Sequence, residues 1–450
     1  MRKIISLSLA LVMLMSIMTG CGTAPSIEEP LPNEPVEQQE LPKIPTSNIK
    51  TPEKEEPQKE ESLNTETNME ITNMGFSAFD SELIEFLHTD KSAENYMVSP
   101  LSFRYAMALA TAGAAGETQQ ELLMSMGFNS MDEYLKWTTG INNIEDQFEA
   151  DLALDIKEFK NYGYGDSEPS RALKVANSIW HNIDDGGTIR EDYINYTKNN
   201  FGAVAADVTR DEIVDKVNTW VDEQTNGMIP SLLPADANQA NTILVNTLYM
   251  KSAWSNAFNK STTKEGDFTT VGGGKVKKDF MFNQAQYRYY EDDDTQIVVL
   301  PMDGGINMAV VLGDNTNISE KLKNVNSEEV IVQLPKFEVE TSFDKKELIN
   351  YLKYKGVDLA LSPDDGADFS PMIDDIGIHI DDIIQKTKIK VDEEGTEAAA
   401  ATAIIMVKNT AVFIDPKEPK KFIANEPFTY YIYTEGETSP ELLFFGQIVQ

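Results

Sequence analysis

Hydrophobic residues recur at two different spacings along the chain, and the two spacings separate predicted helices from predicted strands. From about residue 75, apolar side chains recur at the spacing of a helical turn, which predicts an amphipathic first helix. The same pattern predicts helices over residues 118–126 and 213–223. In the second half of the chain, short apolar runs and alternation with a period of two predict strands instead.

The predicted strands are short and strongly apolar. They cover residues 297–300, 307–312, 336–340, 386–391, 428–432 and 442–445. The last of them is a continuous apolar run, typical of a strand buried on both faces, so we expect the chain to end inside its own core. Because no repeat period and no internal linker divides residues 73–450, the sequence predicts a single α+β domain there.

One segment of this domain does not fit either pattern. Residues 393–403 read EEGTEAAAATA, and irregular sequence continues to about residue 421. An alanine run normally favours a helix, but no apolar stripe flanks this one and it lies between predicted strands. A long stretch without a pattern of its own inside a compact domain is typical of a functional loop, so we expect a loop over about 393–421.

The first 21 residues have the features of an export signal. Arg2 and Lys3 precede an apolar stretch that is shorter than the roughly 20 residues of a membrane-spanning helix, and small residues follow it. The sequence MTGC at its end resembles a bacterial lipoprotein box, in which the cysteine is lipidated and becomes the mature N-terminus. Cys21 is the only cysteine of the chain, which fits a thiol kept for acylation. Ordinary signal cleavage, with no role for Cys21, is the alternative.

Residues 22–72 are rich in proline, glutamate and other polar residues. Such a segment cannot bury enough apolar surface to offset the entropy lost on ordering, so we expect an extended tether. With a lipid on Cys21, this tether predicts a protein anchored at the extracellular face of the bacterial cell membrane, with the membrane as a partner through the lipid.

Composition excludes several classes of function. A formal net charge of -36 argues against a nucleic-acid partner, because binding to phosphates needs clustered lysine and arginine. Three histidines and one cysteine leave few residues for a metal site or a catalytic triad, and no GxSxG, HExxH or phosphate-loop motif is present. GGGK at 272–275 predicts a hairpin turn, and the acidic run 292–294 predicts a solvated turn. We therefore expect no enzyme activity, no metal and no cofactor.

Six segments occur in an order that identifies a family. They are NYMVSPLSFRYAMALATAGAAGETQQEL (95–122), ILVNTLYMKSAWSNAF (243–258), LPKFEVE (334–340), EEGTEAAAATA (393–403), ANEPFTYYI (424–432) and LLFFGQIV (442–449). Together they resemble the serpins, which inhibit serine or cysteine peptidases. The resemblance spans essentially all of residues 73–450. It implies the serpin fold, with a large central mixed β-sheet, further sheets, about eight to nine helices and an exposed reactive-centre loop.

The resemblance also assigns roles to residues outside the loop. Ser99 and Pro100 belong to the segment that forms the shutter under the main sheet, Asn246 matches the shutter asparagine and Trp254 the tryptophan of the breach. All of them pack and hydrogen-bond, and none is catalytic. Gln385 stands where many serpins have a shutter histidine, so no pH-sensitive shutter bond is expected.

A possible ion pair marks the start of the hinge. Lys336 and Glu393 match a pair that can form a salt bridge at the top of the hinge in the family. We expect this pair to be exposed and to contribute about 0 to 1 kcal/mol, so it would tune insertion without deciding it.

The serpin mechanism implies that the cut loop inserts as a new strand into the middle of the largest sheet and drags the acyl-linked peptidase with it. Gly395 would act as a pivot. If Glu397 stays exposed, a period of two turns only uncharged side chains inward. These are Thr396, Ala398, Ala400, Thr402, Ile404 and Met406. The run Ala398, Ala399, Ala400, Ala401 passes between strands without steric obstruction, and about ten new strand residues would gain on the order of 10 kcal/mol from hydrogen bonds.

The cleaved bond is expected within residues 408–410. Counting about seventeen residues from Glu393, as the family pattern implies, places Asn409 before the bond and Thr410 after it. A shift by one residue presents Lys408, which suits a trypsin-like peptidase. Met406, Val407 or Phe413 would instead suit subtilisin-, chymotrypsin- or elastase-like peptidases.

Two functions remain open at this point. The first is a suicide-substrate inhibitor of serine peptidases, which the hinge favours because it has no charge and no proline after Glu397. The second is a non-inhibitory serpin that acts as a surface binding or chaperone-like protein. In either case we expect a monomer.

Overall fold

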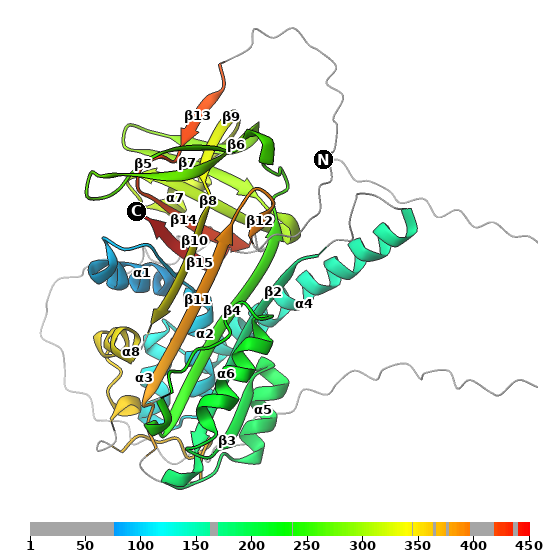
Figure 1. The fold of residues 1–450 in the computed structure, drawn as a ribbon. Helices are drawn as coiled ribbons and strands as arrows, with labels where there is room; N and C mark the ends of the chain where they lie inside the picture. Colours follow the sequence, from blue (N-terminus) through cyan, green and yellow to red (C-terminus); the bar gives the residue numbers. More distant parts are fainter. Residues whose placement is uncertain are drawn as a thin grey trace, which may run out of the picture. The chain divides into compact units, whose positions relative to one another are not determined.

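The computed structural model describes residues 76–162, 170–235, 237–343, 345–362, 366–374, 378–396, 418–434 and 440–450. The chain divides into two units, residues 1–64 and 65–450, and every described residue belongs to the second. The predicted signal peptide, the predicted tether and residues 397–417 of the predicted loop lie outside the described residues. Figure 1 gives the order of the elements along the chain.

The described part contains eight α-helices. They are α1 (Ala78–Lys91), α2 (Pro100–Ala112), α3 (Gly116–Ser125), α4 (Met131–Tyr162), α5 (Glu191–Phe201), α6 (Ile213–Gln224), α7 (Ile318–Lys323) and α8 (Lys345–Tyr354). The start of α1 is fixed by a capping box, in which the side chains of Ser77 and Asp80 each accept a hydrogen bond from the other residue's backbone. None of the described helices combines the length and the apolar character needed to cross a membrane.

A six-stranded sheet carries the candidate site. Its strands lie in the order β10-β11-β12-β4-β2-β3. Their bounds are β2 (Ala172–Asn182), β3 (Val204–Val208), β4 (Thr242–Ala253), β10 (Phe337–Phe343), β11 (Asp382–Val391) and β12 (Gly395–Thr396). Because β12 belongs to the predicted hinge, the sheet that holds the hinge is this one.

A second sheet has nine strands in the order β1-β15-β14-β8-β7-β6-β9-β13, with β5 paired to β6. The bounds are β1 (Tyr96–Val98), β5 (Lys264–Thr269), β6 (Lys275–Glu291), β7 (Thr295–Pro301), β8 (Ile306–Gly313), β9 (Asn326–Pro335), β13 (Lys420–Ile423), β14 (Phe428–Thr434) and β15 (Glu441–Ile448). The expectation that the hinge enters the largest sheet is therefore wrong. Strand pairing joins residues far apart in the chain, so strand counts per sheet do not follow from local pattern.

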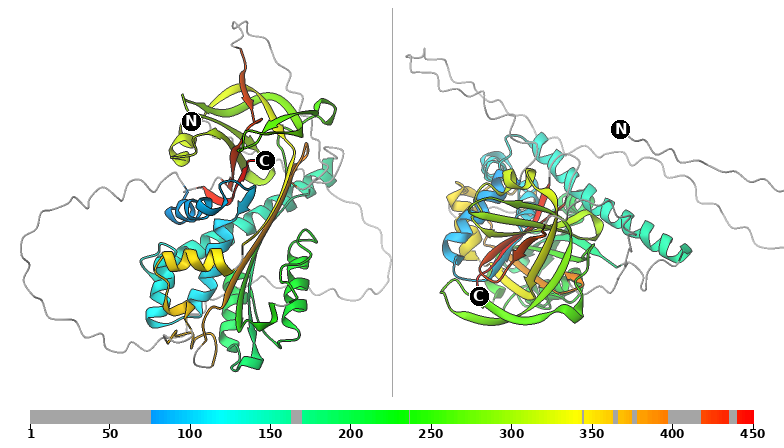
Figure 2. Two further views of the ribbon diagram at one scale, coloured as in Figure 1. Left: turned by 60° about the vertical axis from the view of Figure 1, so that its left-hand side comes forward. Right: turned by 90° about the horizontal axis from the view of Figure 1, so that it is seen from above.

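Two hydrophobic clusters cover the two faces of the six-stranded sheet. Leu244 and Leu248 of β4 point into the main cluster, which contains the buried helix α2. Ile243 and Val245 alternate with them and point into a second cluster with Val217 of α6. The left view of Figure 2 shows the sheet from the side with helices on both faces. Burial on both faces explains why β4 reads as an almost continuous apolar run.

The predicted α+β class and the predicted elements are confirmed. Each predicted helix overlaps α1, α3 or α6, and each predicted strand overlaps β7, β8, β10, β11, β14 or β15. GGGK lies in the turn between β5 and β6, where the amide of Gly273 donates to the carbonyl of Thr270. The acidic run is also a turn, since the carboxylate of Asp292 accepts from the amides of Asp294 and Thr295.

Candidate functional site

The two central strands of the six-stranded sheet, β4 and β11, separate from each other where the hinge begins. Among the described residues, β4 and β11 run parallel and pair with each other only over Ile243–Asn246 and Asp382–Gln385. At the other end of both strands, β12 lies between them, with Thr396 paired to Val391 on one side and to Ser252 on the other. Figure 1 shows β12 at this end of β4. Gly395 and Thr396, the two residues of β12, therefore occupy the space where the two central strands separate.

The two flanking strands stay in register across this division. Val391 and Ser252 differ by 139 residues, and so do Gln385 and Asn246 at the paired end. A strand that continued from Thr396 would therefore meet β4 and β11 in step over its whole length, because neither strand slips by a residue.

Gly395 fits this position because it lacks a side chain. Its φ is 150°, and a Cβ built there would lie 2.2 Å from the carbonyl oxygen of Ser252. Both the backbone conformation and the close approach to β4 therefore require glycine.

Thr396 is the hinge side chain that is buried between the two central strands. It is 1% exposed, and its Oγ1 accepts a hydrogen bond from the amide of Ser252 at 3.1 Å. Its register partner Val391 belongs to the main hydrophobic cluster. The other positions of the predicted inward face, and Glu397 to Ala401, lie outside the described residues.

Trp254 and Phe258 hold the backbone just before the hinge. The indole Nε1 of Trp254 donates to the carbonyl of Asp392 at 2.8 Å, and its amide donates to the carbonyl of Glu394 at 3.0 Å. The amide of Phe258 donates to the carbonyl of Glu393 at 3.0 Å, and the two rings pack edge to face. The three consecutive carbonyls of residues 392–394 are thus fixed to the segment that follows β4.

Two lysines hold the two glutamates at the base of the hinge. Lys336 Nζ lies 2.9 Å from a Glu393 carboxylate oxygen, and Thr263 donates to the other oxygen at 2.7 Å. Lys260 forms an ion pair with Glu394. The expectation of an exposed Lys336–Glu393 pair is wrong for the acid, because Glu393 is only 4% exposed. Burial opposes ionisation of Glu393, but the hydrogen bonds from Thr263 and Lys336 outweigh it, so its pKa lies below the ordinary value.

This lowered pKa predicts an acid-sensitive contribution to stability. Ionised Glu393 stabilises the fold above its ordinary pKa of 4.5, and this contribution is lost as pH falls through the lower pKa of the folded state. We expect Glu393→Gln to lower the free energy of unfolding by about 1 to 3 kcal/mol near pH 7 and to have little effect near pH 3. Denaturant titrations at both pH values measure the difference. A deficit of equal size at both would contradict the proposed ion pair, and Glu338→Gln, in a more exposed pair, serves as the control.

The paired end of β4 and β11 contains the predicted shutter. Ser99 is the N-cap of α2, accepting from the amide of Ser102 at 3.1 Å, and Pro100 occupies the first turn. Gln385 Nε2 donates to Asn246 Oδ1 at 2.8 Å and to the carbonyl of Ser99 at 2.9 Å, and Gln385 Oε1 accepts from the amide of Ser99 at 3.0 Å. One buried amide therefore joins the two central strands and fastens them to α2.

A second asparagine completes this polar cluster. Asn177 of β2 is the register partner of Asn246, and Ser102 Oγ donates to Asn246 Oδ1 at 3.0 Å. Neither amide atom of Asn177 nor Nδ2 of Asn246 has a hydrogen-bond partner among the described residues. While the sheet is closed, these buried donor and acceptor atoms therefore stay available for a further hydrogen-bond partner.

The structure brings together Ser99, Asn246 and Gln385 at one end of the division and Trp254, Lys336, Glu393, Gly395 and Thr396 at the other. Lys260, Thr263 and Glu394 were not singled out from the sequence. Their partners are 130 to 134 residues away, so no local pattern could have indicated them. The predicted cleavage residues Lys408, Asn409 and Thr410, and Cys21, lie outside the described residues.

Comparisons with known proteins identify the family of this chain. A family model described as Serpin (serine protease inhibitor) matches residues 74–450. An uncharacterised serpin-like protein of Methanosarcina acetivorans is 31% identical, covering 79% of this chain and 81% of its own. Antitrypsin of Bombyx mori is 27% identical, covering 80% and 91%.

Solved structures give the same result for the fold. The native-state structure of the thermophilic serpin tengpin is similar with a TM-score of 0.65 and 26% identity, covering 88% of this chain and 97% of that one. The family model matches most of the chain, and the two sheets and eight helices of the described part are consistent with the serpin fold. The chain belongs to the serpin family.

Proposed function

We propose that this serpin is a suicide-substrate inhibitor of serine peptidases, with cysteine peptidases as a second class. In this mechanism a peptidase cuts the loop, becomes acyl-linked to it, and is trapped when the cut loop inserts between β4 and β11. The observation that carries the proposal is β12, which already lies between these strands and is paired with both. The family includes members named as inhibitors, such as the antitrypsin of Bombyx mori.

The shared register of β4 and β11 indicates where the rest of the hinge would lie if it continued as a strand from β12. Continued in step from Thr396, the inserted strand would bring Thr402 level with Gln385 and Asn246. A period of two turns Thr402 to the same face as Thr396, toward the buried polar cluster. Insertion would break the hydrogen bond between Gln385 and Asn246, and the Thr402 hydroxyl is the polar group that would replace it.

Insertion of the cut loop would also supply the free energy that drives trapping of the peptidase. About ten added strand residues, each hydrogen bond contributing roughly 0.5 to 1.5 kcal/mol, amount to on the order of 10 kcal/mol. The alanines at 398–401 add little volume and no charge to the buried side. The uncut protein is therefore a stressed state, and cleavage would release it.

The test is incubation of the purified protein with trypsin, subtilisin, chymotrypsin and elastase. An adduct that survives denaturing electrophoresis and has the summed mass of both proteins supports trapping. The mass of the released C-terminal peptide identifies the cleaved bond, which we propose lies within residues 408–410. Cleavage by all four peptidases without an adduct would favour the non-inhibitory alternative, a surface binding or chaperone-like serpin.

We also propose that a lipid on Cys21 anchors the protein to the extracellular face of the cell membrane. The support is the sequence MTGC at 18–21 and the polar tether that follows it. Radiolabelled palmitate should label the wild-type chain in cells and should not label Cys21→Ser. Label retained by the variant would contradict the anchor.

A further inference from the structure

We propose that a pocket at the edge of β2 binds a small organic carboxylate with an apolar tail. The pocket has a volume of about 450 Å³ and lies between α4, the first residues of β2, Tyr249 of β4 and the end of α6. Volumes of roughly 300 to 1,000 Å³ are usual for sites that take small molecules. The lining shares no residue with the hinge or the shutter described above, so the inference goes beyond inhibition.

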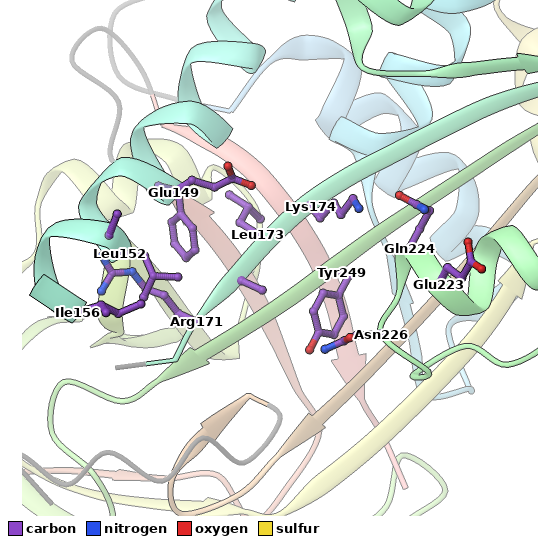
Figure 3. A pocket seen from close by; sticks show the side chains of 13 residues that line it. Glu149, Leu152, Ile156, Arg171, Leu173, Lys174, Glu223, Gln224, Asn226 and Tyr249 are labelled. Carbon is purple, nitrogen blue, oxygen red and sulfur yellow. The ribbon is translucent and has the colours of Figure 1, made fainter. Parts of the chain in front are cut away.

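One wall of the pocket is apolar. Phe148, Leu152 and Ile156 of α4 are spaced by four residues, so one face of the helix lines the pocket, and Leu173 of β2 lines it as well. In Figure 3, Leu152 and Ile156 lie close to Arg171, whereas Tyr249 and Asn226 lie beyond β2. An alkyl chain or an aromatic ring would be removed from water against this wall.

Arg171 gives the pocket its preference for an anion. Its side chain is 6% exposed, its Nη1 lies 2.5 Å from an Asp155 oxygen, and its guanidinium carbon lies 5.4 Å from the centre of the Phe148 ring. Its Nε is buried and has no hydrogen-bond partner among the described residues. A buried donor without a partner is costly, and a guanidinium pairs well with a carboxylate, so a ligand carboxylate would complete this site.

The remaining charges limit the ligand to one negative charge. Lys174 lines the pocket and adds a second cation, but Glu149 of α4 and Glu223 of α6 line it too. Asp155 already neutralises part of the Arg171 charge. A dianion such as a phosphate ester would meet these carboxylates, whereas a monocarboxylate uses the free donor alone.

The experiment is calorimetric titration of the full chain with decanoate below its micelle concentration, with 1-decanol as the neutral match. We expect saturable binding of one decanoate per chain. Decanol, and decanoate with Arg171→Gln, should bind about 10- to 100-fold more weakly, which is the loss expected for a charged hydrogen bond.

A second variant separates loss of the site from loss of the fold. Ala153 lines the pocket and is exposed, so Ala153→Trp should fill the space and abolish decanoate binding without lowering the unfolding temperature. No saturable binding to the wild type, equal binding of decanol, or binding unchanged by Ala153→Trp would each overturn the inference. Binding is measured directly, so the result is independent of whether the protein traps a peptidase.

Discussion

Replacing Thr396 by arginine should turn the proposed inhibitor into a substrate of its target peptidase. The variant is expected to be cut in the loop as fast as the wild type but to form no covalent adduct, a loss of at least about 100-fold in the fraction of peptidase trapped. Thr396 is buried between Val391 and Ser252, and Val391 belongs to the main hydrophobic cluster. Burying an unpaired guanidinium there costs several kcal/mol, which opposes the pairing of β12 with β4 and β11 from which further insertion would continue.

The control for this variant is Thr139→Arg, the same change at an exposed position of α4. It should trap peptidase like the wild type. The measurement is the ratio of adduct to cleaved serpin on a denaturing gel, at equal times and with the same peptidase. Trapping at the wild-type level by Thr396→Arg would contradict insertion that begins at β12.

Replacing Gln385 by leucine should loosen the closed sheet. The change removes three hydrogen bonds and leaves the buried amide of Ser99 without a partner. We expect the free energy of unfolding of the native protein to fall by about 2 to 4 kcal/mol. Because the same bonds hold β4 to β11, the uncut protein should also convert at 37 °C into loop-inserted or polymeric forms at least about tenfold faster.

Gln447→Leu is the matched control for Gln385→Leu. Gln447 is equally buried and donates to two backbone carbonyls, of Lys91 and Glu94, away from the division in the sheet. Both variants should lose stability, but only Gln385→Leu should convert faster on native gels. Equal conversion rates for the two variants would show that the effect is general destabilisation.

Local sequence was sufficient for three of the helices and six of the strands, whereas the start of the hinge came from the family resemblance. Period-two alternation located β10, and the Gly395–Thr396 pair followed from the resemblance and is now seen in the sheet. The structure explains this glycine, because a Cβ at position 395 would collide with the carbonyl oxygen of Ser252.

The Lys336–Glu393 pair followed from the resemblance, but two other contacts that hold the hinge could not be predicted from the sequence. Lys260 and Thr263 belong to a segment that is polar and unremarkable in sequence, and only the fold brings them to Glu394 and Glu393. The burial of Glu393 has the same origin, because it depends on which distant residues cover the carboxylate. The pocket around Arg171 likewise depends on α4 passing beside the edge of β2.

The proposed mechanism requires that cutting the loop adds a strand between β4 and β11. The direct measurement is thermal unfolding of the protein before and after a single cut within residues 408–410, with native mass spectrometry showing that both fragments remain together. We expect the unfolding temperature to rise by roughly 10 to 20 °C, given about 10 kcal/mol from the new hydrogen bonds. An unchanged or lower unfolding temperature after the cut would contradict the account.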